Sequence, residues 1–172
     1  MDRTEFEEFA SAGLPALFRH ARALTGDPQD AQDLLQDALL RVWRAWPAVR
    51  RDGNPIGYAK TTMVRLHSSA LRRMRRRLAG RPVAAPPAEE PSAVDRVDDR
   101  HHLRGLLMRL TPTQRAVLVM TYLEDADDRT IAVALRRRPS SVRATRSRAL
   151  AKLRADLDPA GPRTARGVLP HA

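Results

Sequence analysis

Residues 111–154 read TPTQRAVLVMTYLEDADDRTIAVALRRRPSSVRATRSRALAKLR, and they contain the clearest structural pattern in the chain. Thr111 and Gln114 form a capping box around a proline at the first helical position, so a helix begins there. A brief helix holds Ile131 and Leu135, a turn follows at residues 136–138, and a last helix begins at Pro139. A short helix, a tight turn and a basic helix are the plan of a helix-turn-helix.

The last helix of this motif predicts contact with duplex DNA. In a helix-turn-helix the second helix enters the major groove by its N-terminal end, where free backbone N–H groups also favour phosphate. Arginine reads guanine edges and serine bonds phosphate or base, whereas Val142, Ala149 and Leu153 should face the core. An arginine-rich solvated helix is the ordinary alternative, but motif, position and charge coincide here. The residues expected to face DNA are Ser140, Ser141, Arg143, Ala144, Ser147 and Arg148.

Searching the sequence for catalytic or metal-binding patterns yields little. The acidic segment 124–128 lacks the central glycine and terminal glutamate of an EF-hand, so we expect a solvated loop with Asp127 as a helix cap. The five histidines have no metal spacing such as HExxH, and neither a glycine-rich phosphate loop nor a GxSxG motif occurs. We therefore expect no catalytic residue, no metal and no cofactor, and the protein is not predicted to be an enzyme.

A second amphipathic helix is predicted from Asp27 to Trp46. It opens with a capping aspartate followed by proline, and its apolar residues repeat at three and four along one face. The opposite face is acidic and carries an isolated leucine, which suits docking to a partner, although single exposed leucines are common. This outer stripe comprises Asp33, Gln36, Asp37, Leu40 and Arg41.

The next segment contains a helix face that would suit nucleic acid. Residues 47–55 read as a loop with turn residues and a basic pair, and a helix runs from about Ile56 to Leu78. The open side of this helix carries an aromatic ring, a lysine, hydroxyls and an arginine. An ordinary solvated helix face would look much the same.

Charge points to a polyanionic partner. The chain has 172 residues, with 31 Lys plus Arg against 20 Asp plus Glu and a formal net charge of +11. Residues 1–71 are neutral, and the excess lies in two blocks, 72–82 and 136–172. Two separate contacts with phosphate backbone fit this distribution. The absence of cysteine excludes disulfides, thiol nucleophiles and cysteine zinc sites.

The composition predicts an all-α protein of two small helical domains joined by a flexible proline-rich linker. We expect a first domain at 1–78, a linker at 79–97, a helix-turn-helix domain at 98–157 and a disordered tail at 158–172. Seven aromatic residues suit two small separate cores better than one large core. With no apolar run of membrane-spanning length and no export signal, we expect a cytoplasmic protein that does not insert into membranes.

Two stretches resemble a known family, the extracytoplasmic function (ECF) sigma factors within the sigma-70 family of bacterial RNA polymerase. LTGD at 24–27, DAQDLLQD at 30–37 and LRVWRAW at 40–46 are similar to the family's region 2. LTPTQRAVL at 110–118, YLED at 122–125 and the helix beginning at Pro139 are similar to region 4. The resemblance covers about residues 5–157, and both regions stand in the family's order.

The resemblance implies a sigma factor that binds core RNA polymerase and directs it to promoters. The outer stripe would dock the clamp helices of the β′ subunit, and the first helices of region 4 would meet the β flap. The helix that begins at Pro139 would read the −35 element through the six residues given above. Many members also have an anti-sigma partner. The single-stranded −10 element would be captured by Arg50, Arg51, Asn54, Tyr58, Lys60, Thr61 and Arg65.

Some positions depart from the family's pattern, and these departures bear on DNA recognition. Arg136 stands where the turn usually has glycine, and Arg138 stands where a capping residue is usual. Thr121 replaces a frequent arginine, and Arg65 stands in place of asparagine. A stand-alone helix-turn-helix regulator is the alternative function, and it would need a ligand pocket or dimer seam in residues 1–78. A basic RNA-binding protein would explain the charge but not the neutral first domain.

Overall fold

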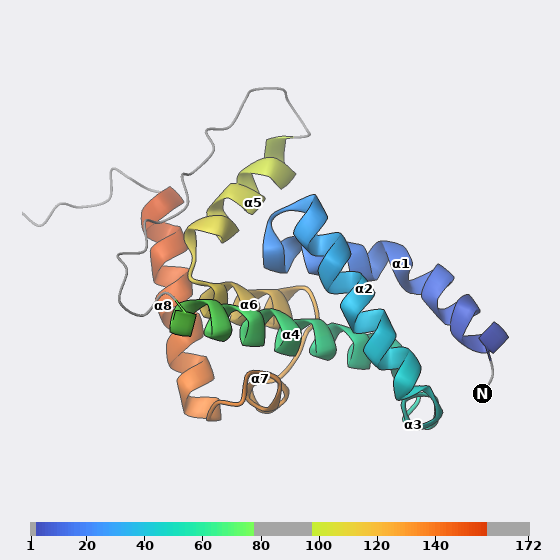
Figure 1. Cartoon of the computed structure of the whole chain (residues 1–172). Helices are drawn as coiled ribbons and strands as arrows, with labels where there is room; N and C mark the ends of the chain where they lie inside the picture. Colours follow the sequence, from blue (N-terminus) through green and yellow to red (C-terminus); the bar gives the residue numbers. More distant parts are fainter. Residues whose placement is uncertain (1–2, 78–97, 158–172) are drawn as a thin grey trace, which may run out of the picture.

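The computed structural model describes residues 3–77 and 98–157, and the regular structure of both parts is helical, with no strand in either (Figure 1). The predicted all-α class is therefore confirmed. The predicted linker and tail lie outside the described residues, and the domain boundaries stay a prediction. The elements in chain order are α1 (Arg3–Thr25), α2 (Pro28–Arg44), α3 (Trp46–Arg51), α4 (Pro55–Arg77), α5 (Asp98–Arg109), α6 (Pro112–Tyr122), α7 (Asp128–Leu135) and α8 (Pro139–Leu157).

Side-chain caps start the helices where the sequence predicts them. The carboxylate of Asp27 accepts hydrogen bonds from the backbone N–H groups of Gln29 at 2.7 Å and Asp30 at 2.9 Å, and α2 begins at the next residue. The capping box of α6 is complete, because Thr111 and Gln114 each accept a hydrogen bond from the other's backbone N–H. Local sequence therefore sets where these helices begin.

The predicted loop between Trp46 and Pro55 is wrong for its first half, because residues Trp46–Arg51 form the short helix α3. Pro47 lies in the first turn of α3, where its missing N–H needs no partner. Trp46 and Val49, three positions apart, are both buried and fix this turn against the rest of the domain. A helix of six residues is too short to show a periodic pattern in the sequence.

The first half packs α1, α2 and α4 against one another. Aromatic rings hold α1 to the α2–α3 corner, with the Phe6 and Trp43 centroids 4.8 Å apart and those of Phe9 and Trp46 5.0 Å apart. In the second half, α8 packs on α6 and α7. Its Val142 and Ala149 are fully buried, as predicted from the spacing of apolar residues.

The two halves pack against each other, with α1 and α4 contacting α6 and α7 (Figure 1). Buried side chains of both halves belong to one continuous apolar cluster. The sequence of α4 explains why, since Thr62, Met63 and Val64 are consecutive and all buried. Successive helical residues point about 100° apart, so α4 is covered on more than one side. The expectation of two separate cores is therefore wrong for this arrangement.

Candidate nucleic-acid interface

The N-terminal half of α8 presents the predicted −35 residues on the outside of the molecule. Of the six, only Ser141 is partly buried, and the other five are exposed. The turn before α8 is made without glycine, because Arg136 adopts the left-handed conformation with φ at 53°. This left-handed residue ends α7 and turns the chain into the basic helix.

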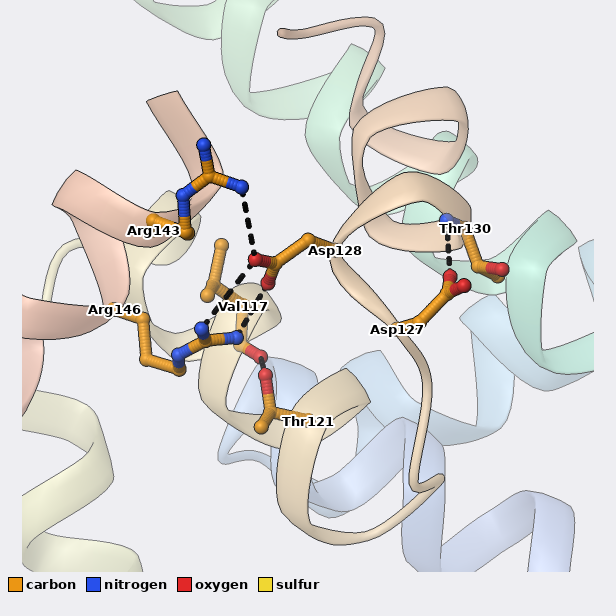
Figure 2. Close-up of polar contacts among 7 residues, drawn as sticks. All are labelled: Val117, Thr121, Asp127, Asp128, Thr130, Arg143 and Arg146. Atoms are coloured by element: carbon orange, nitrogen blue, oxygen red, sulfur yellow. Dashed lines mark hydrogen bonds and ion pairs between the residues drawn. The ribbon is translucent and has the colours of Figure 1, made fainter. Parts of the chain in front are cut away.

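Two ion pairs across the motif, which the sequence did not reveal, join Asp128 to the predicted −35 residue Arg143 and to its neighbour Arg146 (Figure 2). Asp128, the first residue of α7, accepts a hydrogen bond from Arg146 of α8 at 2.5 Å and lies 3.6 Å from the guanidinium of Arg143. Arg146 is the more buried of the two, and Arg143 is 61% exposed. Asp128 therefore links α7 to α8, while most of the Arg143 side chain remains exposed to solvent.

Thr121, where the resemblance implies arginine, also lies at this motif. Its hydroxyl donates a hydrogen bond to the backbone carbonyl of Val117 at 2.8 Å (Figure 2). The hydroxyl is therefore satisfied by its own helix.

The acidic segment 124–128 is only partly the solvated loop that the sequence predicts, because Asp125 and Asp127 are exposed whereas Glu124 and Asp128 are not. Asp127 does cap α7, accepting a hydrogen bond from the backbone N–H of Thr130 at 2.7 Å, and this bond lowers the pKa of its carboxyl group. Glu124, in contrast, is largely buried and contacts His20 of α1 and Lys60 of α4. These partners are 104 and 64 positions away in the chain, so no local pattern could have indicated them.

The predicted −10 residues do not form one open face. Arg51, Tyr58 and Arg65 are exposed, and exposed Arg50 donates a hydrogen bond to Glu5 at 2.5 Å. The side-chain oxygen of Asn54 accepts a hydrogen bond from the backbone N–H of Gly57, so this oxygen is used in capping the start of α4. The remaining two residues, Lys60 and Thr61, are partly buried beside the second half of the chain.

The predicted polymerase-binding stripe lies on the outer side of α2, and all five of its residues are exposed. Leu40 is 56% exposed, so α2 presents an apolar side chain among charges. Beside it, an apolar hollow of about 490 Å³ opens between α1 and α2. The residues lining this hollow are Arg3, Phe6, Glu7, Gln36, Leu39, Leu40 and Trp43.

A buried cation, Arg115, and a partly buried histidine, His67, lie near the meeting of the two halves. Arg115 of α6 donates hydrogen bonds to the backbone carbonyls of Leu24 at 2.6 Å and Leu107 at 3.0 Å, and burial lowers its pKa to about 10. Burial, with a smaller contribution from the charge of Arg115, lowers the pKa of His67 to about 4. His67 is therefore neutral at physiological pH.

Within residues 3–77 and 98–157, no three histidine, aspartate or glutamate side chains are gathered so as to hold a metal ion. No helix among the same residues has the length and apolar character needed to span a bilayer.

Comparison with known proteins finds two family regions in order. Residues 9–77 match the model of Sigma-70 region 2, and residues 100–153 match that of Sigma-70, region 4. An RNA polymerase sigma-E factor of Streptomyces avermitilis is 35% identical over 155 residues, covering 90% of this chain and 86% of that protein. The RNA polymerase sigma-E factor of Streptomyces coelicolor is 36% identical over 159 residues, covering 89% of this chain and 86% of that protein.

A solved structure shares the fold. It is described as a co-crystal structure of the sigma factor RpoE with the anti-sigma factor NepR from Bartonella quintana. The match has a TM-score of 0.65 at 20% identity, and it covers 92% of this chain and 99% of the other.

Proposed function

This chain belongs to the sigma-70 family of RNA polymerase sigma factors, of the ECF type, and from that premise we propose how its helices divide the work of promoter recognition. Region 2, within α1–α4, binds the polymerase and captures the −10 element as a single strand. Region 4, within α5–α8, reads the −35 element as duplex. The protein determines where transcription starts and catalyses no reaction itself. It acts in the cytoplasm, where the polymerase and the chromosome are found.

The observation that carries the −35 assignment is the exposed basic end of α8 next to the left-handed turn at Arg136. Helix N-termini favour phosphate, and a guanidinium held at such an end can form two hydrogen bonds to a guanine edge. Arg143 and Arg148 are the two exposed arginines of this end, and Ser140 and Ser147 are suited to phosphate.

The −10 assignment rests on region 2 and on the position of the exposed residues beside α4. The single strand would lie along Arg51, Tyr58 and Arg65, with an unstacked base resting on the tyrosine ring. Lys60 would join this surface when its contact with Glu124 is broken.

Docking to polymerase is assigned to the outer stripe of α2 together with the apolar hollow beside it. Leu40 stands at the edge of the hollow, flanked by Gln36 and Arg41 of the stripe. A helical partner would place an apolar side chain in the hollow and its basic groups against Asp33 and Asp37. The clamp helices of the β′ subunit are the proposed occupant.

Promoter-dependent run-off transcription with purified core polymerase tests this function. The full-length chain should direct a discrete start site that depends on both promoter elements, and core polymerase alone should give none. Leu40→Glu should weaken core binding by tenfold or more. Leu14→Glu changes a similarly exposed leucine on α1 and should leave core binding unchanged.

Two results would contradict the proposal. A chain that binds duplex DNA but neither binds core polymerase nor directs a start site is a stand-alone regulator. Equal weakening of core binding by Leu40→Glu and Leu14→Glu would show that the stripe is not the docking surface.

A further inference from the structure

The last turns of α4 carry a dense block of arginines. Residues 72–82 contain six arginines and no acid. Four of the six lie exposed in α4, within the part of the chain that the structure describes: Arg72, Arg73, Arg76 and Arg77. No carboxylate in that part of the chain forms an ion pair with any of the four. Arg72 donates a hydrogen bond to the hydroxyl of Ser69 at 3.0 Å, a neutral partner that leaves its charge uncompensated.

Helix stability alone does not account for this block. The C-terminal end of a helix favours cations, but the effect is confined to about the last turn. Arg72 lies more than one turn before Arg77, where α4 ends. Like charges four positions apart repel each other on a helix surface, and the block contains two such pairs, Arg72 with Arg76 and Arg73 with Arg77. An anion from outside the chain would relieve this repulsion.

One open face of α4 connects the block to the proposed −10 residues. Tyr58, Arg65 and Arg72 are all exposed and follow one another at intervals of seven positions, which is close to two helical turns. Ser69 comes four positions after Arg65, and Arg76 comes four positions after Arg72, so both lie on the same face. This α4 face, from Tyr58 to Arg76, covers eighteen positions, or about 27 Å at 1.5 Å per residue.

The other two arginines, Arg73 and Arg77, lie beside the α4 face. Arg73 comes seven positions after Leu66, which packs against the apolar cluster, and Arg77 comes fourteen positions after Met63, which is fully buried. Both arginines therefore continue the side of α4 that packs inward nearer its start. The two pairs share a helix, a charge and a spacing, and they differ in the direction they face.

The contacts assigned to regions 2 and 4 require promoter DNA to change form between them. The −10 element is bound as a single strand along Tyr58 and Arg65, whereas the −35 element is bound as duplex by α8. The DNA must therefore become double-stranded on the side of the −10 element that faces the −35 element. Region 4 follows α4 in the chain, so the C-terminal end of α4 lies toward that side.

Duplex DNA is the polyanion that suits this end of the helix. It carries one negative charge for about every 1.7 Å of its axis, twice the charge of a single strand. Arg72 and Arg76 are about 6 Å apart along α4, a length over which a duplex presents roughly three or four phosphates. Contacts between arginine and phosphate position a protein on DNA without reading the base sequence.

We propose that Arg72 and Arg76 bind the phosphate backbone of the duplex next to the single-stranded −10 element, on its −35 side. The proposal rests on the function assigned above, because it needs Tyr58 and Arg65 to hold the −10 element as a single strand. The junction between single strand and duplex then lies between Arg65 and Arg72. The contact is independent of base sequence.

Two double variants of equal charge test this site in the full-length chain. Arg72→Gln with Arg76→Gln removes two charges from the α4 face, and Arg73→Gln with Arg77→Gln removes two charges beside it. Both pairs lose the same long-range attraction to DNA. All four positions are exposed and glutamine is a good helix former, so α4 is preserved in both variants.

Binding is measured by fluorescence anisotropy with the holoenzyme, the full-length chain on core polymerase. One probe is the single-stranded −10 sequence of a promoter that the holoenzyme uses. The forked probe continues this strand, on its −35 side, into a duplex of arbitrary sequence without a −35 element. Arg72→Gln with Arg76→Gln should weaken binding of the forked probe at least fivefold and of the single strand less than twofold. Arg73→Gln with Arg77→Gln should weaken binding of either probe less than twofold.

Salt dependence and lysine variants distinguish a phosphate contact from base readout. On the forked probe, loss of Arg72 and Arg76 should make the slope of log affinity against log salt shallower by about two. Arg72→Lys with Arg76→Lys should restore affinity to within threefold, because phosphate accepts hydrogen bonds from either cation. A loss that lysine does not restore, or that changes with the duplex sequence, would overturn the proposal.

Failure of the duplex site and failure of the sigma function give different results. Equal losses in the two double variants, or equal losses on the two probes, would overturn the duplex site while binding of the −10 strand stands. If the holoenzyme binds the −10 strand no more tightly than a strand of scrambled sequence, the −10 assignment itself falls, and the duplex site falls with it.

Discussion

Among single residues, Asp128 links the two helices of the helix-turn-helix through its contacts with Arg143 and Arg146. Asp128→Asn preserves the shape of the side chain but removes the charge that orients Arg143, so discrimination between the correct and an altered −35 sequence should fall. Arg143→Ala should reduce discrimination by roughly 5-fold to 150-fold, the equivalent of about 1–3 kcal/mol. Run-off transcription on promoters that differ only in the −35 element measures the ratio.

The ratio matters because removing an acid strengthens attraction to all DNA alike. Arg154→Ala, an exposed change near the C-terminal end of α8, is the control and should leave the ratio unchanged. The double variant Asp128→Asn with Arg143→Ala should discriminate no worse than Arg143→Ala alone. Full discrimination by Asp128→Asn would show that Arg143 does not depend on Asp128.

Arg136 carries backbone strain because it takes a left-handed conformation that favours glycine. Arg136→Gly should raise the free energy of unfolding by about 1 kcal/mol, measured by urea unfolding. Arg137→Gly, one residue later and without a positive φ, should be neutral or destabilising. If both glycine variants changed stability equally, the gain could not come from the turn.

For whole elements, the start of α6 is the clearest case of a helix fixed by local sequence. Thr111→Ala removes one side of the capping box and should cost about 1 kcal/mol of stability. Thr113→Ala makes the same chemical change two residues later, inside the helix, where alanine is favourable. Thermal unfolding should therefore rank Thr111→Ala clearly below Thr113→Ala, and the reverse order would exclude the cap as the cause.

The sequence predicts elements well where a cap and proline precede a periodic apolar face. Asp27 with Pro28 and Thr111 with Pro112 begin helices as expected, and the spacing of Val142 and Ala149 predicts which side of α8 is buried. Prediction from the sequence fails at α3, because its six residues make fewer than two helical turns. Buried Trp46 stabilises that helix by tertiary packing, which no local pattern contains.

At the scale of the whole molecule, the sequence predicts the helices of each half but not the packing of one half against the other. The contact of Arg115 with the Leu24 carbonyl joins residues 91 positions apart, and that of His20 with Glu124 joins residues 104 apart. Arginine and glutamate read as solvated residues when only their neighbours in the chain are known. The proposed site residues were predicted from sequence motifs and from the family resemblance. The contact of Lys60 with Glu124, which partly buries Lys60, could be learned only from the fold.

Stability should depend on pH through His67, whose pKa falls to about 4 from an ordinary value of 6.5. The folded state favours the neutral ring, so its contribution is complete above about pH 6.5 and is lost as the pH falls toward 4. Urea unfolding should show a loss of about 2 kcal/mol between pH 7.5 and pH 5 from this group. His67→Leu should flatten that dependence.

His102→Gln, a change at an exposed histidine, is the control and should leave the pH dependence intact. Glu124 contributes little over this range, because its lowered pKa keeps it charged. A pH dependence that is identical in His67→Leu and the unaltered chain would show that another group is responsible.

The apolar cluster shared by the two halves makes their separation energetically costly. Parting the halves exposes apolar surface, at about 25 cal/mol for each Å² returned to water, and this cost is the same for every DNA sequence. Any partner that separates the halves must therefore supply at least this free energy from its own contacts with the chain.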